Sequence, residues 1–571
     1  MDCPDEPKNR IMRGPVFRRY STAVSRIFAL LPLGAVGAAF ILPYGTALFS
    51  ARLGGAGGGA GVILGNPSFL PVAAFTVRQA ALSTLTALVL GLPGAWLLGG
   101  RRFRFSRLIR SLTSIPFAMP PILVVLGFVL FFGNAGWANR LLMIISGAEE
   151  GPLRILYKPS AIILAHGFYN FPLVIRLVGD GLMQAKKAYA PAAASLGASG
   201  FKTALTVLFP IALPSLLAAS LLVFLYSFTS FAVVLVLGGG PAATTMAVEI
   251  YRYARISLDY SSAGTLALIE TLIAGLALWG YLFFERKSRR VTVSAAAGNP
   301  MEKRAASPAA RLGIIVYGLV IFFFILGPLL SIPVESFLSR PSRAALPRWS
   351  PGWWLSLGNR VLPALGRSLI LAMLSATLAC FMGILAAGAA RNAGPRSLAG
   401  TLLRFCSTAP LVSSGIVLGL GWILLYGRDH SRSLWALVVV HGVSALPFAF
   451  ASISAGLNSL PENTLRAASA FGAGPVIRII TVELPLSFRR VRSAWGFAAA
   501  ISLGELNAVL MLGMEEWETL PLLIYRAAGS YRFGLACAAG TLLIAACAGA
   551  FLLSEAGTFG AGSPKEESHG H

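Results

Sequence analysis

The chain repeats a pattern of small residues, a glycine and a proline once in each half. The first copy contains Ala192, Ala193, Gly197 and Pro210, and the second contains Ala467, Ala468, Gly472, Leu484 and Pro485. In both copies the glycine precedes the proline by 13 positions, and the two glycines lie 275 positions apart. The register continues on both sides, since His166 matches His441 and Ser227 matches Ser502. A duplication this long predicts two similar halves.

The composition predicts a protein whose solvent is the lipid bilayer. Of the 571 residues, 56% are hydrophobic and 12% are charged, and the mean hydropathy is +0.73. So few charges cannot cover the surface of a soluble protein of this length. The five cysteines show no metal-ligand spacing, so the sequence indicates no metal site, no disulfide framework and no cofactor.

The net charge of +25 has two possible explanations, nucleic-acid binding or membrane topology. The basic residues cluster in gaps between apolar runs, at 10–26, 101–110 and 286–311. Alternate gaps rich in Lys and Arg are typical of the cytoplasmic loops of membrane proteins. We therefore expect the lipid bilayer, and no nucleic acid, among the partners of this chain.

The apolar runs predict an all-α polytopic fold of about twelve transmembrane helices, in two parallel six-span repeats. The expected spans centre near Ala38, Leu88, Val124, Leu173, Leu222 and Ile273, and near Phe322, Cys380, Val417, Val440, Ala500 and Leu543. The first run, residues 27–49, is longer than a signal-peptide core, so we interpret it as a retained span. The loop after the third span is 19 residues shorter in the second half, because Gly127 aligns with Gly421 at an offset of 294.

These runs divide the chain into five segments. Residues 1–26 form a basic amino terminus, 27–284 the first half, 285–311 a basic linker, 312–555 the second half, and 556–571 a polar tail. Six spans per half place both termini and the linker on one side of the membrane, and the basic residues assign that side to the cytoplasm.

Each repeated motif lies between two spans on the basic side, where we expect short helices outside the bilayer. Gly197 and Gly472 would supply a backbone turn. The paired alanines would form a smooth helix face for a partner. Pro210 and Pro485 would end the helical run where the chain re-enters the membrane.

This motif resembles the "EAA" loop of binding-protein-dependent ABC importer permeases, which reads Glu-Ala-Ala, three residues, Gly, nine residues, Ile-x-Leu-Pro. The residues that match are Ala192, Ala193, Gly197 and Pro210 in the first half, and Ala467, Ala468, Gly472, Leu484 and Pro485 in the second. The family's Glu is replaced by Pro191 and Arg466. The resemblance implies an ABC permease fold and coupling loops that dock onto separate ATPase subunits, two identical copies being expected. It also implies an extracytoplasmic solute-binding protein and a location in the bacterial inner membrane.

Fusion of two permease halves resembles the ferric iron and thiamine importer branch. The segments that look closer to the thiamine permease are residues 227–251 and 519–531. The function implied is inward transport of a small cationic solute, thiamine or its phosphates, with ferric iron as the alternative.

The sequence contains no Gly-Lys-Ser or Gly-Lys-Thr, so it lacks a Walker-type phosphate-binding loop. We expect no catalytic residues and no enzyme activity in this chain. An ion-driven carrier or a membrane enzyme would need facing acids or histidines in mid-membrane, and the sequence shows no such pairs.

Two carboxylates lie within apolar runs, Glu270 in the sixth span and Glu505 in the eleventh. Ser230 is the counterpart of Glu505 at the 275 spacing. A carboxylate in the pathway would attract a cationic solute, and nearby aromatic rings would add cation–π contacts. Alternatively, these side chains hold helices together through hydrogen bonds. His166 and His441 match between the halves, which favours packing or hydrogen bonding within each half.

Overall fold

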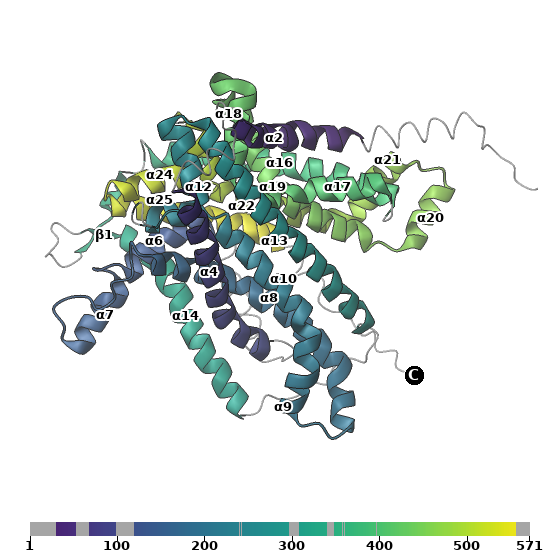
Figure 1. Ribbon diagram of the computed structural model, residues 1–571, viewed down its shortest axis with the longest axis horizontal. Helices are drawn as coiled ribbons and strands as arrows, with labels where there is room; N and C mark the ends of the chain where they lie inside the picture. The colour runs from purple at the N-terminus through teal and green to yellow at the C-terminus, as the bar shows by residue number, and fades with distance from the viewer. Residues whose placement is uncertain are drawn as a thin grey trace, which may run out of the picture.

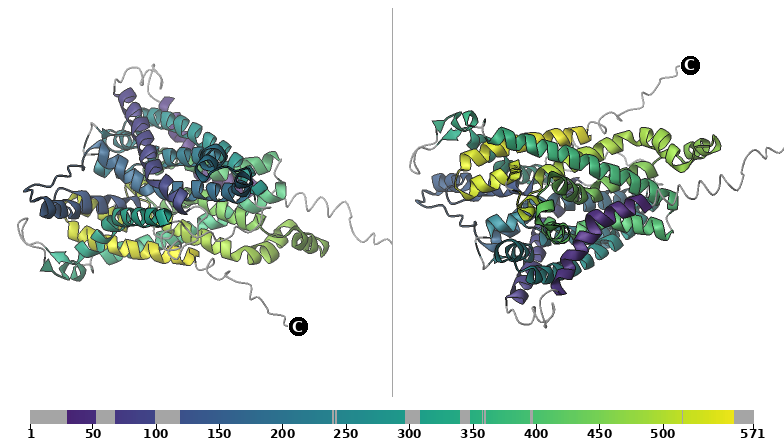
Figure 2. Two further views of the ribbon diagram at one scale, coloured as in Figure 1. Left: turned by 90° about the horizontal axis from the view of Figure 1, so that it is seen from below. Right: turned by 90° about the horizontal axis from the view of Figure 1, so that it is seen from above.

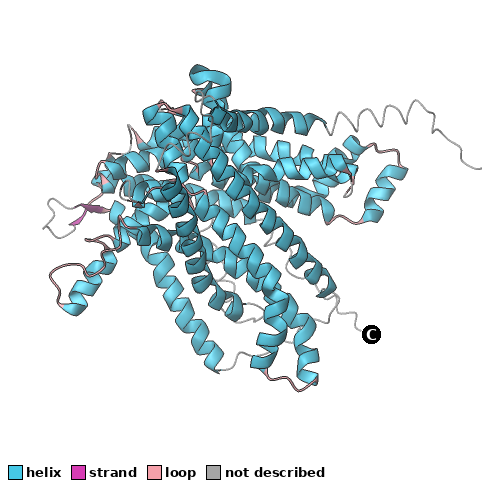
Figure 3. Cartoon of the chain, in the orientation of Figure 1, coloured by secondary structure: helices cyan, strands magenta, loops and turns pink. Residues whose placement is uncertain are grey.

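A computed structural model of the protein describes residues 30–555, apart from 53–67, 99–118, 239, 241–242, 296–307, 340–347, 357, 359, 395–396 and 515. Helices make up nearly all of this part (Figure 3). Its strands are β1 (Leu338–Ser339) and β2 (Arg348–Trp349), which pair antiparallel. Long helices satisfy their own backbone hydrogen bonds, as lipid requires. The predicted all-α class is confirmed.

The two halves contain a similar succession of long helices. The first half has η1 (Gly37–Ile41), α2 (Leu42–Phe49), α4 (Phe69–Leu98), α6 (Pro121–Phe132), α7 (Trp137–Ser146), α8 (Pro159–Ser195), α9 (Gly200–Thr203), η4 (Ala204–Leu208), α10 (Phe209–Phe228), α11 (Ala232–Leu237), α12 (Met246–Arg252) and α13 (Tyr260–Ala295). The second half has α14 (Pro308–Ser336), α15 (Gly352–Leu355), α16 (Val361–Ala393), α17 (Leu398–Thr408), η7 (Ala409–Val412), α18 (Gly415–Ser431), α19 (Leu434–Asn458), α20 (Glu462–Ala470), α21 (Pro475–Arg478), η8 (Ile479–Glu483), α22 (Leu484–Gly504), α23 (Asn507–Leu512), α24 (Leu520–Gly529) and α25 (Phe533–Glu555). At the 275 spacing, α9 and η4 correspond residue for residue to α21 and η8. The predicted duplication is therefore confirmed.

The number of spans differs from the predicted twelve. Ten helices within the described residues are long and apolar enough to cross a bilayer. An eleventh span is a bent pair, in which 398–412 and 415–431 meet at 105°. The remaining segment is α22, the counterpart of α10. Helix α22 carries Arg489, Arg490 and Arg492, so it is less apolar than the other spans.

The first span of each half packs against the third segment of the other half. In the first half this span, Leu30–Phe49, contacts α18, and the first span of the second half, α14, contacts α6. A Cβ on Gly421 would lie 1.9 Å from the Pro43 carbonyl oxygen, and a Cβ on Gly127 would lie 2.6 Å from the Pro328 carbonyl oxygen. Glycine is needed at both positions because another backbone passes so close. The halves are thus interlocked, and both views in Figure 2 show helices of the two halves running alongside one another.

The structure also describes the two ends of the predicted linker and the loop that is longer in the first half. Helix α13 continues to Ala295 and α14 begins at Pro308, so both ends of the predicted linker 285–311 are helical and its middle lies outside the described residues. The predicted terminal segments 1–26 and 556–571 also lie outside them. The extra residues of the first half contain α7, since α6 and α8 align with α18 and α19 with no counterpart of α7 between them.

Two groups of long helices diverge from a shared end of the molecule (Figure 1). Helix α9 lies at the tip of one group, and α20 and α21 lie at the tip of the other. Helix α7, the β1–β2 hairpin and α18 lie toward the shared end. The repeated motifs therefore occupy the far tips of two diverging bodies.

Candidate functional site

The two repeated loops have the same backbone geometry. Gly197 has φ +76° and Gly472 has φ +83°, in the left-handed region. The N–H of Ala198 donates to the Ala193 carbonyl at 3.0 Å, and the N–H of Ala473 donates to the Ala468 carbonyl at 3.1 Å. Together with the bonds from Gly197 N–H to Ala194 and from Gly472 N–H to Ser469, this is a Schellman helix end. Both glycines are needed for their backbone conformation, since a Cβ at either would meet open space.

The exposed surface of these loops differs from the predicted alanine face. Ala192 and Ala467 are exposed, but Ala193 is buried and Ala468 is half-buried. The most exposed of the large apolar side chains are instead Leu196 and Phe471, which are 87% and 92% exposed. They correspond at the 275 spacing and directly precede the two glycines. A bulky apolar residue repeated among small ones is the signal that could have identified them.

The expectation that Pro210 and Pro485 end the helical run is wrong. The helical run from 200 to 228 is continuous through Pro210, and the run from 475 to 504 is continuous through Pro485. Each proline sits in the first turn after a five-residue π turn, η4 or η8. The wider turn accommodates a residue that cannot donate a backbone hydrogen bond, so the chain enters the long helix without a break.

The second loop is fastened by a buried ion cluster. The Glu483 side chain is 1% exposed and accepts from Arg478 at 2.7 Å and from Arg391 of α16 at 3.1 Å. Arg478 also donates to Asn392 at 2.6 Å and to Ser469 of α20 at 3.4 Å. One guanidinium therefore connects the loop helix, the π turn and the neighbouring span.

The first loop is fastened differently. Leu208 stands at the position of Glu483 and is buried, and Thr203 stands at the position of Arg478. Lys186 lies 4.3 Å from the centre of the Trp96 ring and donates to the Trp96 carbonyl at 3.3 Å. An apolar hollow lined by Trp96, Phe201 and other side chains lies beside this loop. The two loops thus share an exposed shape but rest on different contacts.

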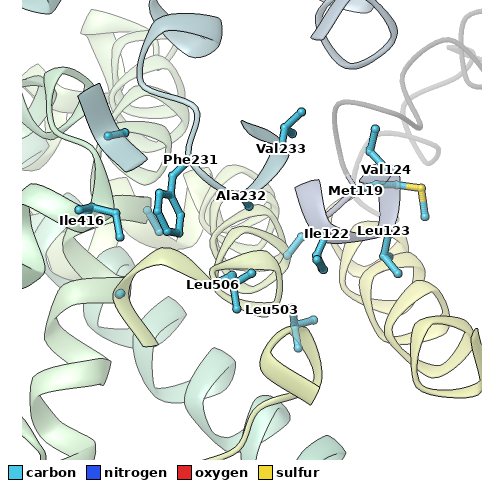
Figure 4. Packing of buried hydrophobic residues seen from close by; sticks show 14 of the residues in the cluster. Met119, Ile122, Leu123, Val124, Phe231, Ala232, Val233, Ile416, Leu503 and Leu506 are labelled. Atoms are coloured by element: carbon cyan, nitrogen blue, oxygen red, sulfur yellow. The ribbon is translucent and has the colours of Figure 1, made fainter. Parts of the chain in front are cut away.

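A second candidate site is a cavity where the two halves meet. Its volume is about 150 Å³, and its lining includes Pro120 and Tyr169 from the first half and Phe497 and Glu505 from the second. Figure 4 shows part of the packing around it, with Ala232 of α11 near Leu506, which precedes α23; both line the cavity, as does Met119 before α6. The Oε1 atom of Glu505 accepts the N–H groups of Asn507 at 2.9 Å and Ala508 at 3.3 Å. The second oxygen, Oε2, has no hydrogen-bond partner among the described residues.

The structure thus has two equivalent exposed loops and a cavity between two similar halves. More than half of the chain also matches a known protein family. Residues 91–290 and 379–555 both match the family described as the inner membrane component of binding-protein-dependent transport systems. The chain belongs to this family. It is a fused two-half permease of the inner membrane, with one family unit in each half. Membership implies an ATPase and a solute-binding protein as partners.

Several relatives of this permease are similar over most of their length. The thiamine transport system permease protein ThiP of Brucella suis is 30% identical over 514 residues, which is 88% of this chain and 91% of that protein. ThiP of Haemophilus influenzae is 27% identical over 481 residues, or 83% and 86%. ThiP of Escherichia coli is 26% identical over 472 residues, or 81% and 84%.

The other predicted pathway residues of the permease do not join Glu505. Ser230 is half-buried just before α11 and does not line the cavity. Glu270 is 1% exposed in α13, beside the hydrogen-bonded pair Tyr44 and Thr271, and neither of its carboxylate oxygens has a hydrogen-bond partner in the described part of the chain. The structure therefore does not bring the three predicted residues together.

The two matched histidines are internal to their halves. His166 Nδ1 lies 3.3 Å from the Ser83 hydroxyl, and His441 Nδ1 lies 3.0 Å from the Ser502 hydroxyl. Both histidines are buried. Hydrogen bonding within each half, as the repeat predicts, is confirmed.

Proposed function

We propose that this permease is the translocation subunit of an ATP-driven importer for thiamine or its phosphates. The observation that carries the proposal is the likeness to ThiP proteins across both halves, covering 88% of this chain and 91% of the Brucella suis protein. A similarity confined to one half would support only the general fold. ATP is hydrolysed by a separate subunit, and this chain supplies the membrane path.

The two repeated loops are the contacts for the ATPase, and two identical copies are bound. Leu196 and Phe471 project from equivalent Schellman turns, so one kind of groove can accept either loop. Gly197 and Gly472 hold the turns, and Ala192 and Ala467 complete the exposed surface. Both termini lie on the same side as these loops, in the cytoplasm.

The cavity at Glu505 is the passage for the positively charged ring of the solute. One oxygen of Glu505 is engaged by backbone N–H groups, which leaves Oε2 for a cation. Tyr169 and Phe497 line the same cavity, and aromatic faces attract cations. A closing motion of the ATPases would change which end of the cavity is open, as differential contacts in the two states require.

The test is uptake of radiolabelled thiamine into vesicles that contain the permease with its ATPase and binding protein. The Gly197→Asp, Gly472→Asp double variant should insert normally and lose ATP-driven uptake, because aspartate disturbs both turns. Gly147→Asp is the matched control, since Gly147 has φ +67° with open space around it, at the end of α7. Ferric ion offered instead of thiamine should give no uptake; uptake of ferric ion alone would contradict the substrate.

A further inference from the structure

A lateral groove lies between the first span, α13 and the α17–η7 segment. Its walls are apolar and aromatic, with Phe40 from the first span, Trp279 and Leu282 from α13, and Phe405 from α17. Its volume is about 1020 Å³, and it is open to the side. Tyr44 and Thr271 also line it, and their hydroxyls lie 2.6 Å apart. This groove is separate from the cavity at Glu505.

One end of the groove is basic. Arg286 and Lys287 line it, and both are exposed. Within the described part of the chain, neither side chain has a hydrogen bond or an ion pair. Two adjacent cations at the mouth of an apolar groove are complementary to a phosphate group that carries acyl chains.

The length of the groove corresponds to one leaflet of a bilayer. Thr271 and Lys287 are 16 residues apart on one helix, which is about 24 Å along its axis. Half of a bilayer, including its headgroup layer, is about 20–22 Å thick. Trp279 is 67% exposed and stacks on Phe283, with ring centres 6.0 Å apart, so the wall between the two ends offers flat apolar surface.

We propose that this groove binds one anionic phospholipid. The phosphate lies between Arg286 and Lys287, and an acyl chain follows Leu282 and Trp279 toward Thr271. Because α13 belongs to the first half and α17 to the second, the lipid fills space between the halves. A neutral zwitterionic lipid would fit the apolar wall but would leave the net positive charge of the mouth uncompensated.

The experiment uses the full-length permease in nanodiscs of phosphatidylcholine that contain increasing fractions of dibrominated phosphatidylglycerol or dibrominated phosphatidylcholine. Bromine quenches tryptophan at short range, and the difference between the natural chain and Trp279→Phe isolates the Trp279 signal. Phosphatidylglycerol should quench this signal at a mole fraction at least fivefold lower than phosphatidylcholine does. The Arg286→Gln, Lys287→Gln variant should lose this preference.

The matched control is Lys158→Gln, Arg348→Gln, which removes two exposed positive charges elsewhere and should keep the preference. Equal quenching by the two lipids would overturn the proposal, because the groove would then be ordinary lipid-facing surface. Absence of any Trp279 quenching would also overturn it, because protein would then cover the groove. Neither result depends on transport, so failure here is distinct from failure of the proposed function.

Discussion

Leu196 and Phe471 lie 275 residues apart at the same place in the two repeats, and each is almost fully exposed beside a glycine with positive φ. Leu196 lies between α8 and α9, and Phe471 lies between α20 and α21; α9, α20 and α21 are at the tips of the diverging helix groups (Figure 1). Their matched protrusion from the two loops supports the proposal that the ATPase covers them.

Replacing Leu196 and Phe471 with alanine should weaken the binding of the ATPase. Each side chain contributes about 1.5–3 kcal/mol when it is buried, so each loop should lose roughly 10-fold to 100-fold in affinity. Titration of the purified ATPase against the permease by surface plasmon resonance measures this. Ile144→Ala, Ile145→Ala removes equally exposed apolar side chains from α7 and should bind as the natural chain does. A deficit of equal size in that control would contradict the assignment of the loops.

Glu483→Gln should destabilise the permease strongly. It removes the charge that Arg478 and Arg391 share, and breaking a buried ion pair costs about 3–5 kcal/mol. Glu462→Gln is the control within the same loop, because its pair with Arg466 is exposed on both sides and should matter by about 0.5 kcal/mol or less. Thermal unfolding in detergent should show a clear drop in Tm for the first variant alone; similar Tm values would refute the role of the cluster.

Gly421→Ala should disturb the interlocking of the halves. The added Cβ would lie 1.9 Å from the Pro43 carbonyl oxygen, so the first span must move away from α18. Overpacking of this kind costs about 1–3 kcal/mol. Gly366→Ala is the control in α16, where a Cβ meets nothing within 4 Å. A higher Tm for Gly366→Ala and a lower Tm for Gly421→Ala are expected; equal values would show that the contact tolerates a methyl group.

Glu505→Gln should reduce thiamine uptake at least tenfold while the fold stays intact. The amide oxygen of glutamine can still accept the N–H groups of Asn507 and Ala508, but the charge is gone. Glu505→Ala should lower both uptake and Tm, because the two N–H groups at the start of α23 lose their acceptor. Unchanged uptake by the glutamine variant would mean that Glu505 only caps α23.

The contact between Glu518 and two arginines predicts a pH effect. Partial burial alone would raise the pKa of the Glu518 carboxyl, but Arg360 at 3.0 Å and Arg526 at 3.3 Å hold it below its usual value. The ionised Glu518 therefore stabilises the fold at pH values above about 4.3, the pKa of a glutamate in the unfolded chain. This stabilisation is lost as the pH falls through the lower pKa that Glu518 has in the folded protein. Glu518→Gln should lower Tm at pH 7, and the difference should shrink below about pH 4. A difference that stays constant would exclude this linkage.

Much of the architecture could be predicted from the sequence. Hydropathy and the 275 spacing are properties of the chain alone, so the halves, most spans and the positions of Gly197 and Gly472 followed from them. The register also anticipated the hydrogen bonds of His166 and His441 within their own halves.

Other features depend on contacts between distant segments. The apolar pattern of the span Leu30–Phe49 does not reveal that it packs on α18 of the other half; the close approach of Gly421 to Pro43 does. The sequence predicts the span near Ala500, but it does not reveal that Glu483 and Arg478 are buried together just before α22. Pro210 and Pro485 indicate helix ends in the sequence because proline usually interrupts a helix. The π turns that accommodate them leave no simple sequence signal.

The most direct test of the central claim is photo-crosslinking from benzoylphenylalanine placed at position 196 or 471. The purified complex of permease and ATPase would be irradiated, and the crosslinked peptides identified by mass spectrometry. Both positions should crosslink to the same surface of the ATPase, and position 144 on α7 should not. Absence of ATPase adducts at 196 and 471, in a complex that still transports thiamine, would contradict the account.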